Sequence, residues 1–165
     1  MNEEKRRRKP FKRILRFFSA GMLLVLILFP LMTIAPKVFG IQSYVIISGS
    51  MEPSIPTGSL VYVRSTNTEI IQEGDIITFY SNRNSSLPTT HRVVENKASE
   101  KEIITKGDAN EKEDILPVRY ADVLGKVVFF LPYLGKLLLL LSTVQGKIVY
   151  VMLFGFTMMM NYRNN

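Results

Sequence analysis

The chain has 165 residues, with a single histidine, no cysteine and a formal net charge of +7. Without cysteine it has no structural disulfide, thiolate zinc site or cysteine nucleophile, and one histidine is too few for a clustered histidine metal site. We therefore expect no metal and no cofactor. The length suits one small domain with additional anchoring segments.

The positive charge is concentrated at the N-terminus. Residues 1–16 contain eight basic and two acidic residues, whereas the rest of the chain is close to neutral. A nucleic-acid-binding protein carries positive charge along its folded part, so we expect no nucleic-acid partner. A basic tail beside an apolar run is instead typical of a membrane orientation signal, and we expect residues 1–16 to be a cytoplasmic tail.

The first apolar run covers residues 17–36 and contains no charged residue. A helix of about 20 apolar residues crosses the hydrocarbon core of a bilayer, so this run predicts a transmembrane helix. The basic tail before it indicates a cytoplasmic N-terminus and an exported following chain. The alternative is a cleaved signal peptide, but the apolar core of such a peptide is only about 7–15 residues long.

A second apolar region covers residues 127–162 and is interrupted by Lys136, Gln145 and Lys147. It predicts a multi-pass protein of the cell membrane, or alternatively of the endoplasmic reticulum membrane. A different possibility is that the whole region lies along the membrane surface. The segments that we expect are an interfacial segment at 131–142, a second transmembrane helix at 143–161 and a tail at 162–165.

Residues 37–130 are expected to form an extracytoplasmic all-β domain. Short apolar and β-branched runs alternate there with turn signals, and no long segment has a helical repeat. This pattern predicts short, curled sheets. The expected strands are Tyr44–Ile47, Leu60–Val63, Ile76–Tyr80, Arg92–Val94, Glu102–Thr105 and Val123–Phe130, with loops at 81–89 and 96–101.

The segment from Ser48 to Gly58 is the best candidate for chemistry in this domain. The apolar run ends at Ser48, Gly49 permits a sharp turn, and two prolines hold the following loop. Such a turn can present the hydroxyl of Ser50 at the end of a sheet, although a Ser-Gly-Ser turn alone is usually only a turn. The apolar side chains beside it are expected in the core (Ile46, Ile47) or at the membrane surface or a substrate groove (Met51, Ile55).

Three motifs, in their order along the chain, resemble the boxes of type I signal peptidases. Residues 48–53 (Ser-Gly-Ser-Met-Glu-Pro) resemble the nucleophile box, and residues 106–110 (Lys-Gly-Asp-Ala-Asn) resemble the Gly-Asp box, with Asp114 following. Residues 90–93 (Thr-His-Arg-Val) look like the second box of the branch that uses histidine where most bacterial members use lysine. That branch comprises endoplasmic-reticulum, archaeal and spore-former-like enzymes. Ala109 departs from a plain Gly-Asp-Asn box.

The resemblance implies roles for five residues. Ser50 would be the nucleophile and His91 its general base, because a serine hydroxyl needs a base to take its proton and histidine titrates near neutrality. The backbone N–H of Ser50 and the hydroxyl of Ser48 would form the oxyanion hole. A carboxylate can orient the imidazole. Asp108 and Asp114 are both candidates, and we favour Asp114, with Asp108 supporting the loop around Ser50.

The function implied by the resemblance is that of a membrane-bound serine endopeptidase that removes signal peptides at the outer membrane surface. Its partners would be secretory preproteins with small residues at the first and third positions before the cut, the lipid bilayer and the export machinery. Two alternatives remain open. One is a non-catalytic, membrane-anchored β-domain that binds a partner. The other is a Ser-Lys protease with Lys97, Lys101 or Lys106 as base, against which the setting of His91 argues.

Overall fold

The computed structural model describes residues 3–81 and 87–164. Most of the loop predicted at 81–89 therefore lies outside the described residues. The chain forms two compact units, one made of Met1–Ala35 with Leu140–Asn165 and the other of Pro36–Leu139. We describe each unit by itself.

The first unit contains two long helices, α1 (Glu3–Val38) and α3 (Val144–Asn164). Helix α1 begins inside the predicted basic tail, and its part from Arg16 to Val38 is long and apolar enough to cross a membrane. Among the described residues, α3 meets that criterion only together with α2 (Leu134–Ser142), from which it is bent by 97°. The apolar helix indicates membrane association, whereas crossing by α3 stays a prediction.

Polar side chains join α1 to α3. The buried hydroxyl of Ser19 donates a hydrogen bond to Oδ1 of Asn161 over 3.1 Å. Farther along, the hydroxyl of Tyr150 donates to the backbone carbonyl of Leu26. Inter-helix hydrogen bonds of this kind hold helices together where lipid removes the hydrophobic driving force. These two hydrogen bonds join the helices of this unit at two points.

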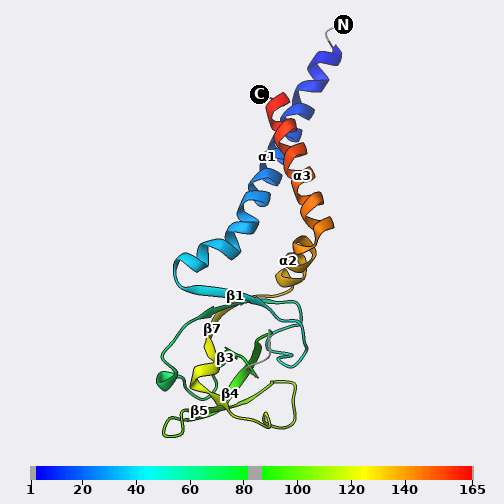
Figure 1. Cartoon of the computed structure of the whole chain (residues 1–165). Helices are drawn as coiled ribbons and strands as arrows, with labels where there is room; N and C mark the ends of the chain where they lie inside the picture. The colour runs from blue at the N-terminus through cyan, green and yellow to red at the C-terminus, as the bar shows by residue number, and fades with distance from the viewer. Residues whose placement is uncertain (1–2, 82–86, 165) are drawn as a thin grey trace. The chain divides into compact units, whose positions relative to one another are not determined.

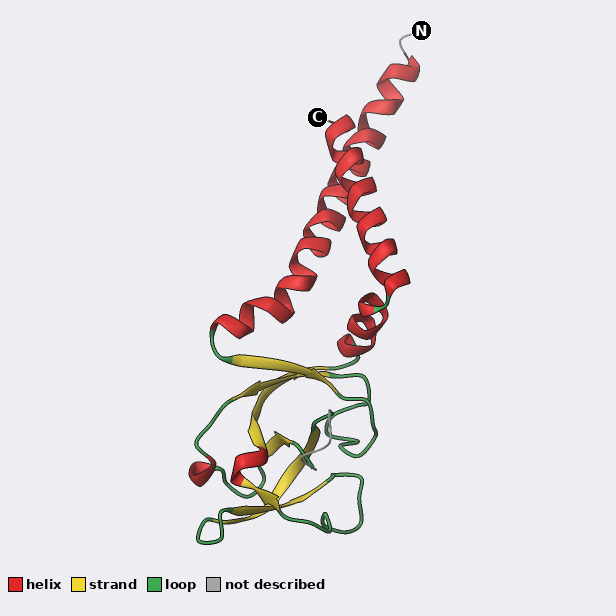
Figure 2. Ribbon diagram, in the orientation of Figure 1, coloured by secondary structure: helices red, strands yellow, loops and turns green. Residues whose placement is uncertain are grey.

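The second unit is built on one antiparallel sheet that curls on itself (Figures 1 and 2). The strand order is β1-β2-β7-β3-β4-β5-β6, so β1 and β6 are the edges. This confirms the all-β prediction for the domain that follows the first helix. The strands are β1 (Ile41–Val45), β2 (Leu60–Arg64), β3 (Ile76–Phe79), β4 (Thr89–Lys97), β5 (Glu102–Lys106), β6 (Val118–Arg119) and β7 (Val123–Leu131).

The observed strands differ from the predicted ones at three places. Strand β1 begins at Ile41, three residues earlier than expected, and ends at Val45, so that Ile46 and Ile47 lie outside it. Strand β4 starts at Thr89 and runs for nine residues. The loop expected at 96–101 is correspondingly shorter, because β4 continues to Lys97. The two-residue strand β6 was not predicted, since so short a pairing leaves no alternating pattern.

Two apolar clusters stabilise the sheet. Ile71, Ile77, Phe79, Val93, Ile103 and Val118 form the first, and Ile46, Met51, Ile55, Val61 and Val63 form the second. Met51 and Ile55 are fully buried, so the prediction that they face the membrane surface or a groove is wrong. Ile47 is 62% exposed, so its predicted core position is also wrong. The turn directs Met51 and Ile55 into the core. The two-residue repeat of a strand does not predict the direction of side chains within a turn.

Candidate active site

The loop that carries Ser50 is fixed at both of its ends. The backbone N–H of Ile46 donates to Ser59, and that of Gly58 donates to the carbonyl of Ile46, over 2.9 and 2.7 Å. Within the loop, the hydroxyl of Thr57 donates to the carboxylate of Glu52 over 2.7 Å. This hydrogen bond lowers the pKa of Glu52. Because its two anchors, Met51 and Ile55, are also buried, the loop presents Ser50 on a rigid support.

Ser50 and Ser48 lie together at the start of this loop. Their hydroxyl oxygens are 3.2 Å apart, and Ser50 is half-buried whereas Ser48 is exposed. The hydroxyl of Ser48 could therefore donate a hydrogen bond to a substrate oxygen that becomes negatively charged next to Ser50. This is the arrangement that an oxyanion hole requires.

A second loop, which follows β5, is hydrogen-bonded to the backbone of Ser50. The N–H of Ala109 donates to the Ser50 carbonyl over 2.9 Å. A Cβ atom at Gly107 would lie 2.7 Å from the same carbonyl oxygen and 2.8 Å from Nδ2 of Asn110. Only glycine allows this approach, which explains the glycine of the third motif. Ala109 contributes through its backbone, so its side chain does not disturb the contact.

His91 projects from β4 and is 7% exposed. Its Nδ1 lies 2.6 Å from Oδ2 of Asp114. An ionised carboxylate only accepts hydrogen bonds, so Nδ1 carries the proton and Nε2 keeps a free electron pair. The geometry therefore selects the tautomer in which Nε2 can act as a base.

Thr105 of β5 holds Asp114 in place. Its hydroxyl donates to Oδ2 of Asp114 over 2.6 Å, while the N–H of Asp114 donates to the carbonyl of Thr105 over 2.8 Å. Thr105 is completely buried. Sequence reasoning did not select this residue, although a polar side chain at a buried position of an alternating strand was a usable signal.

Asp108 has a different partner from Asp114. Its two oxygens accept hydrogen bonds from Nε and Nη2 of Arg92 over 2.8 and 2.6 Å, which is the strong bidentate geometry. Nη2 of Arg92 also donates to the hydroxyl of Ser54, in the loop of Ser50, over 3.4 Å. The hydrogen bonds from Arg92 are the main cause that lowers the pKa of Asp108, and His91 adds a weaker effect in the same direction. Asp108 thus ties β4 to the loop of Ser50.

Replacing Asp108 by asparagine is expected to lower the free energy of unfolding by roughly 1–2 kcal/mol near neutral pH, because Arg92 loses a charged partner. The pKa of Asp108 is lowered in the folded chain, so its stabilisation is complete above the ordinary value of 3.8 and is lost as the pH falls through the folded value. Thermal unfolding in detergent at a series of pH values measures this difference.

The matched control is Asp122→Asn, which removes an ion pair with Arg119 on a short exposed turn. Such a pair contributes little, so its loss is expected to be smaller. Equal stability of Asp108→Asn and the unmodified chain at neutral pH would contradict the structural role of Asp108.

The remaining predicted site residues lie at different distances from this centre. Among the described residues, no hydrogen bond joins Ser50 to His91, which is common in catalytic sites without substrate. Lys97 and Lys101 lie at the turn between β4 and β5, whereas Lys106 is the last residue of β5 and lines a small depression together with Glu111, Lys112 and Glu113. Within the described ranges, the carboxylate of Asp114 contacts His91 and none of these three lysines.

The amino-acid sequence matches known signal peptidases. Residues 16–96 match the family described as "Signal peptidase, peptidase S26". The chain is 37% identical over 110 residues to the signal peptidase complex catalytic subunit SEC11 of Colletotrichum graminicola, a match that covers 59% of this chain and 62% of the relative. It is 38% identical over 98 residues to signal peptidase I W of Bacillus subtilis, covering 58% of this chain and 50% of that protein.

The matched segment contains Ser50 and His91 but ends before Asp108 and Asp114. The chain spans between half and about six-tenths of the length of these two relatives. The assignment of the two aspartates to the site is therefore supported by the contacts described above. The assignment of Ser50 and His91 is supported by contacts and by similarity. The curled sheet, the apolar first helix and these matches together make the chain similar to the signal peptidase family, peptidase S26.

Proposed function

We propose that the chain is a membrane-bound serine endopeptidase that removes signal peptides from secretory preproteins. Ser50 is the proposed nucleophile, His91 its general base, and Asp114 the carboxylate that orients His91. The observation that carries the proposal is the hydrogen bond of 2.6 Å from Nδ1 of His91 to Asp114, in a chain similar to this family. A binding module without catalysis has no need of a buried imidazole held in one tautomer.

The proposed reaction has two halves. Nε2 of His91 takes the proton of the Ser50 hydroxyl while the oxygen attacks the carbonyl carbon of the scissile bond. The N–H of Ser50 and the hydroxyl of Ser48 stabilise the negative oxygen that forms. His91 then gives its proton to the leaving amine as the C–N bond breaks, and the signal peptide stays esterified to Ser50. A water molecule, deprotonated by His91, hydrolyses this ester and restores the serine.

The signal peptide has a suitable site along the edge strand. A groove of about 570 Å³ runs beside β1, and it is lined by residues 43–48, by Ser50 and by the apolar side chains of Leu87 and Leu139. Edge strand β1 has one unpaired side, and an extended peptide can add to such an edge through backbone hydrogen bonds. We propose that the residues before the cut bind there, with small side chains facing the sheet next to Ser50.

Incubating the detergent-solubilised chain with a model preprotein tests this function. A single cut is expected directly after the last residue of a small-x-small pattern, identified by the mass of the products. A preprotein with phenylalanine at the position before the cut is expected to stay intact, because the ring does not fit beside the sheet. Cleavage that ignores this residue, or no cleavage at all, would contradict the proposal.

The proposed topology follows from the helices and the charge. The basic N-terminal segment lies in the cytoplasm, α1 crosses the membrane and the sheet unit faces the outside, where exported preproteins emerge from the export machinery. Helix α3 returns the chain across the membrane, because the pair α2 and α3 has the length and composition of a bent span. The location is a cell membrane or, as the alternative, the endoplasmic reticulum membrane.

Protease protection of sealed, right-side-out membranes is expected to leave residues 1–16 intact and to degrade the sheet unit. A reporter fused after Asn165 is expected to remain inside, because α3 recrosses the bilayer. A sheet unit protected on the inside would contradict the processing of exported substrates, and an external C-terminal reporter would place α3 along the membrane surface instead.

A further inference from the structure

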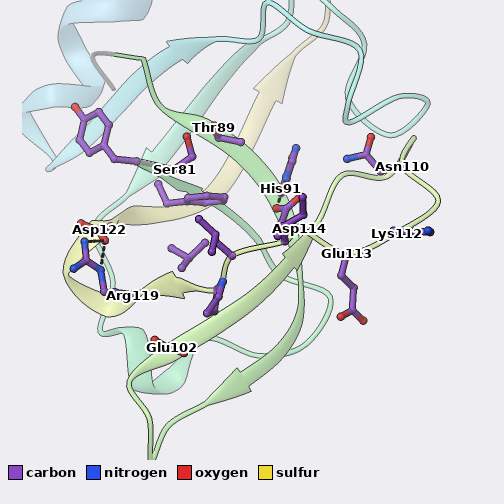
Figure 3. Close-up of a pocket in the computed structure, with 16 residues that line it drawn as sticks. Ser81, Thr89, His91, Glu102, Asn110, Lys112, Glu113, Asp114, Arg119 and Asp122 are labelled. Carbon is purple, nitrogen blue, oxygen red and sulfur yellow. Dashed lines mark hydrogen bonds and ion pairs between the residues drawn. The ribbon is translucent and has the colours of Figure 1, made fainter. Parts of the chain in front are cut away.

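His91 is one of the residues that line a second and larger groove. The groove has a volume of about 1090 Å³, and its lining runs from Thr89, His91 and Asp114 to the loop of residues 115–117 (Figure 3). It shares Ser81 and Thr89 with the groove along β1, while Ser48 and Ser50 line the groove along β1 alone. The first strand residues of β4 therefore separate two adjoining grooves, one next to the nucleophile and one next to its base.

The chemistry of the proposed reaction assigns different parts of a substrate to the two grooves. The part before the cut stays bonded to Ser50 and so occupies the groove that contains this residue. The amine that leaves must take its proton from His91, and it must therefore lie within hydrogen-bond reach of the imidazole. The residues attached to that amine then continue from His91 into the larger groove. We propose that this groove binds the first residues of the released chain, an inference that rests on the proposed function.

The side chains of the groove indicate what it recognises. Ile115 is 98% exposed and Leu116 is 71% exposed, directly after Asp114 in the chain. Large apolar side chains gain free energy when a ligand covers them. The charged groups give less: Arg119 and Asp122 are paired with each other, and Lys112 and Glu113 point away from His91 (Figure 3). Glu102 lies at the opposite end of the lining.

The occupant is therefore an extended peptide segment held by apolar contact. Because Ile115 follows the residue that orients His91, its contact with the leaving chain lies next to the proton transfer. The binding energy is available while the amine is still bonded, so it acts on the rate of acylation and not on hydrolysis of the ester. Substrates with several residues after the cut are expected to be processed faster than substrates with one.

The test compares two peptides that share the sequence before the cut and carry either one or ten residues after it. The detergent-solubilised full chain is compared with the double variant Ile115→Ser, Leu116→Ser. We expect kcat/KM of the double variant to fall about tenfold on the long peptide, because part of the apolar contact is lost, and to be unchanged on the short one. The control is Ile70→Ser, the same type of substitution at an isoleucine that is 65% exposed and lies outside the groove. This variant is expected to cut both peptides at the normal rate.

Cleavage of the short peptide also reports that the double variant is folded. Equal rates of the double variant and the unmodified chain on the long peptide would overturn the inference. So would an equal loss on both peptides, since it would show a general defect and no contact with the leaving chain. In both cases the unmodified chain still cuts, so the proposed function stands; if the unmodified chain cuts neither peptide, the proposed function and the inference fall together.

Discussion

Replacing Asp114 by asparagine is expected to lower kcat by about 10⁴ while leaving the melting temperature nearly unchanged. The carboxylate accepts the hydrogen bond from Nδ1 of His91 over 2.6 Å. An asparagine amide can present N–H instead, which favours the imidazole with its proton on Nε2 and removes the base from the side of Ser50. The charge that stabilises the imidazolium is lost at the same time.

Two further variants make this test specific. Thr105→Val removes the hydroxyl that donates to Asp114 but keeps the carboxylate, so a decrease of roughly ten- to hundredfold is expected from the loss of one hydrogen bond to a charged group. Asp122→Asn changes an aspartate of the same groove that pairs with Arg119, and it is expected to keep normal turnover. A fully active Asp114→Asn, with a stable but inactive Asp108→Asn, would reverse the roles of the two aspartates.

The different partners of Asp108 and Asp114 show which contacts the sequence motifs do not predict. Both residues lie in one polar loop, and neither has a local pattern that names its partner. The bidentate contact of Asp108 depends on Arg92, which is next to His91 in β4 and faces the other side of the sheet. Strand alternation could have predicted that neighbouring residues of β4 need different carboxylates. Which aspartate serves which residue depends on the path of the loop in space.

The sheet was predictable as a type but not in its registers. Apolar runs such as Leu60–Val63 coincide with a strand because all of their side chains are buried. The start of β1 and the whole of β6 are set by pairing with a neighbouring strand, which a local pattern does not encode. Met51 and Ile55 were misassigned for the same reason, since the loop that buries them is closed by hydrogen bonds between Ile46 and residues 58–59, just before β2.

The proposal of histidine, and not lysine, as the base could be made from the sequence because the chain has one histidine, inside a recognisable motif. Thr105 was harder to select, since threonine is an ordinary strand residue and only its position on the buried side of an alternating strand marks it. Its function depends on Asp114, nine residues later, returning to the same strand. Residues that position a proposed catalytic residue, such as Thr105, are therefore identified mainly from three-dimensional contacts.

The central claim is that Ser50 is the nucleophile, and cleavage of a model preprotein by the Ser50→Ala variant tests it most directly. Loss of a catalytic serine has lowered kcat by about 10⁶ in a well-studied protease, so no product is expected within the time of the assay. The variant is expected to insert in membranes and to unfold at the same temperature as the unmodified chain, because Met51 and Ile55 still anchor its loop.

Ser99→Ala, on the turn between β4 and β5, is the matched control and is expected to cut at the normal rate. Absence of product with Ser50→Ala, together with normal cleavage by Ser99→Ala and by the unmodified chain, is the result that the proposed mechanism predicts. Cleavage of the preprotein by Ser50→Ala at the rate of the unmodified chain would contradict it.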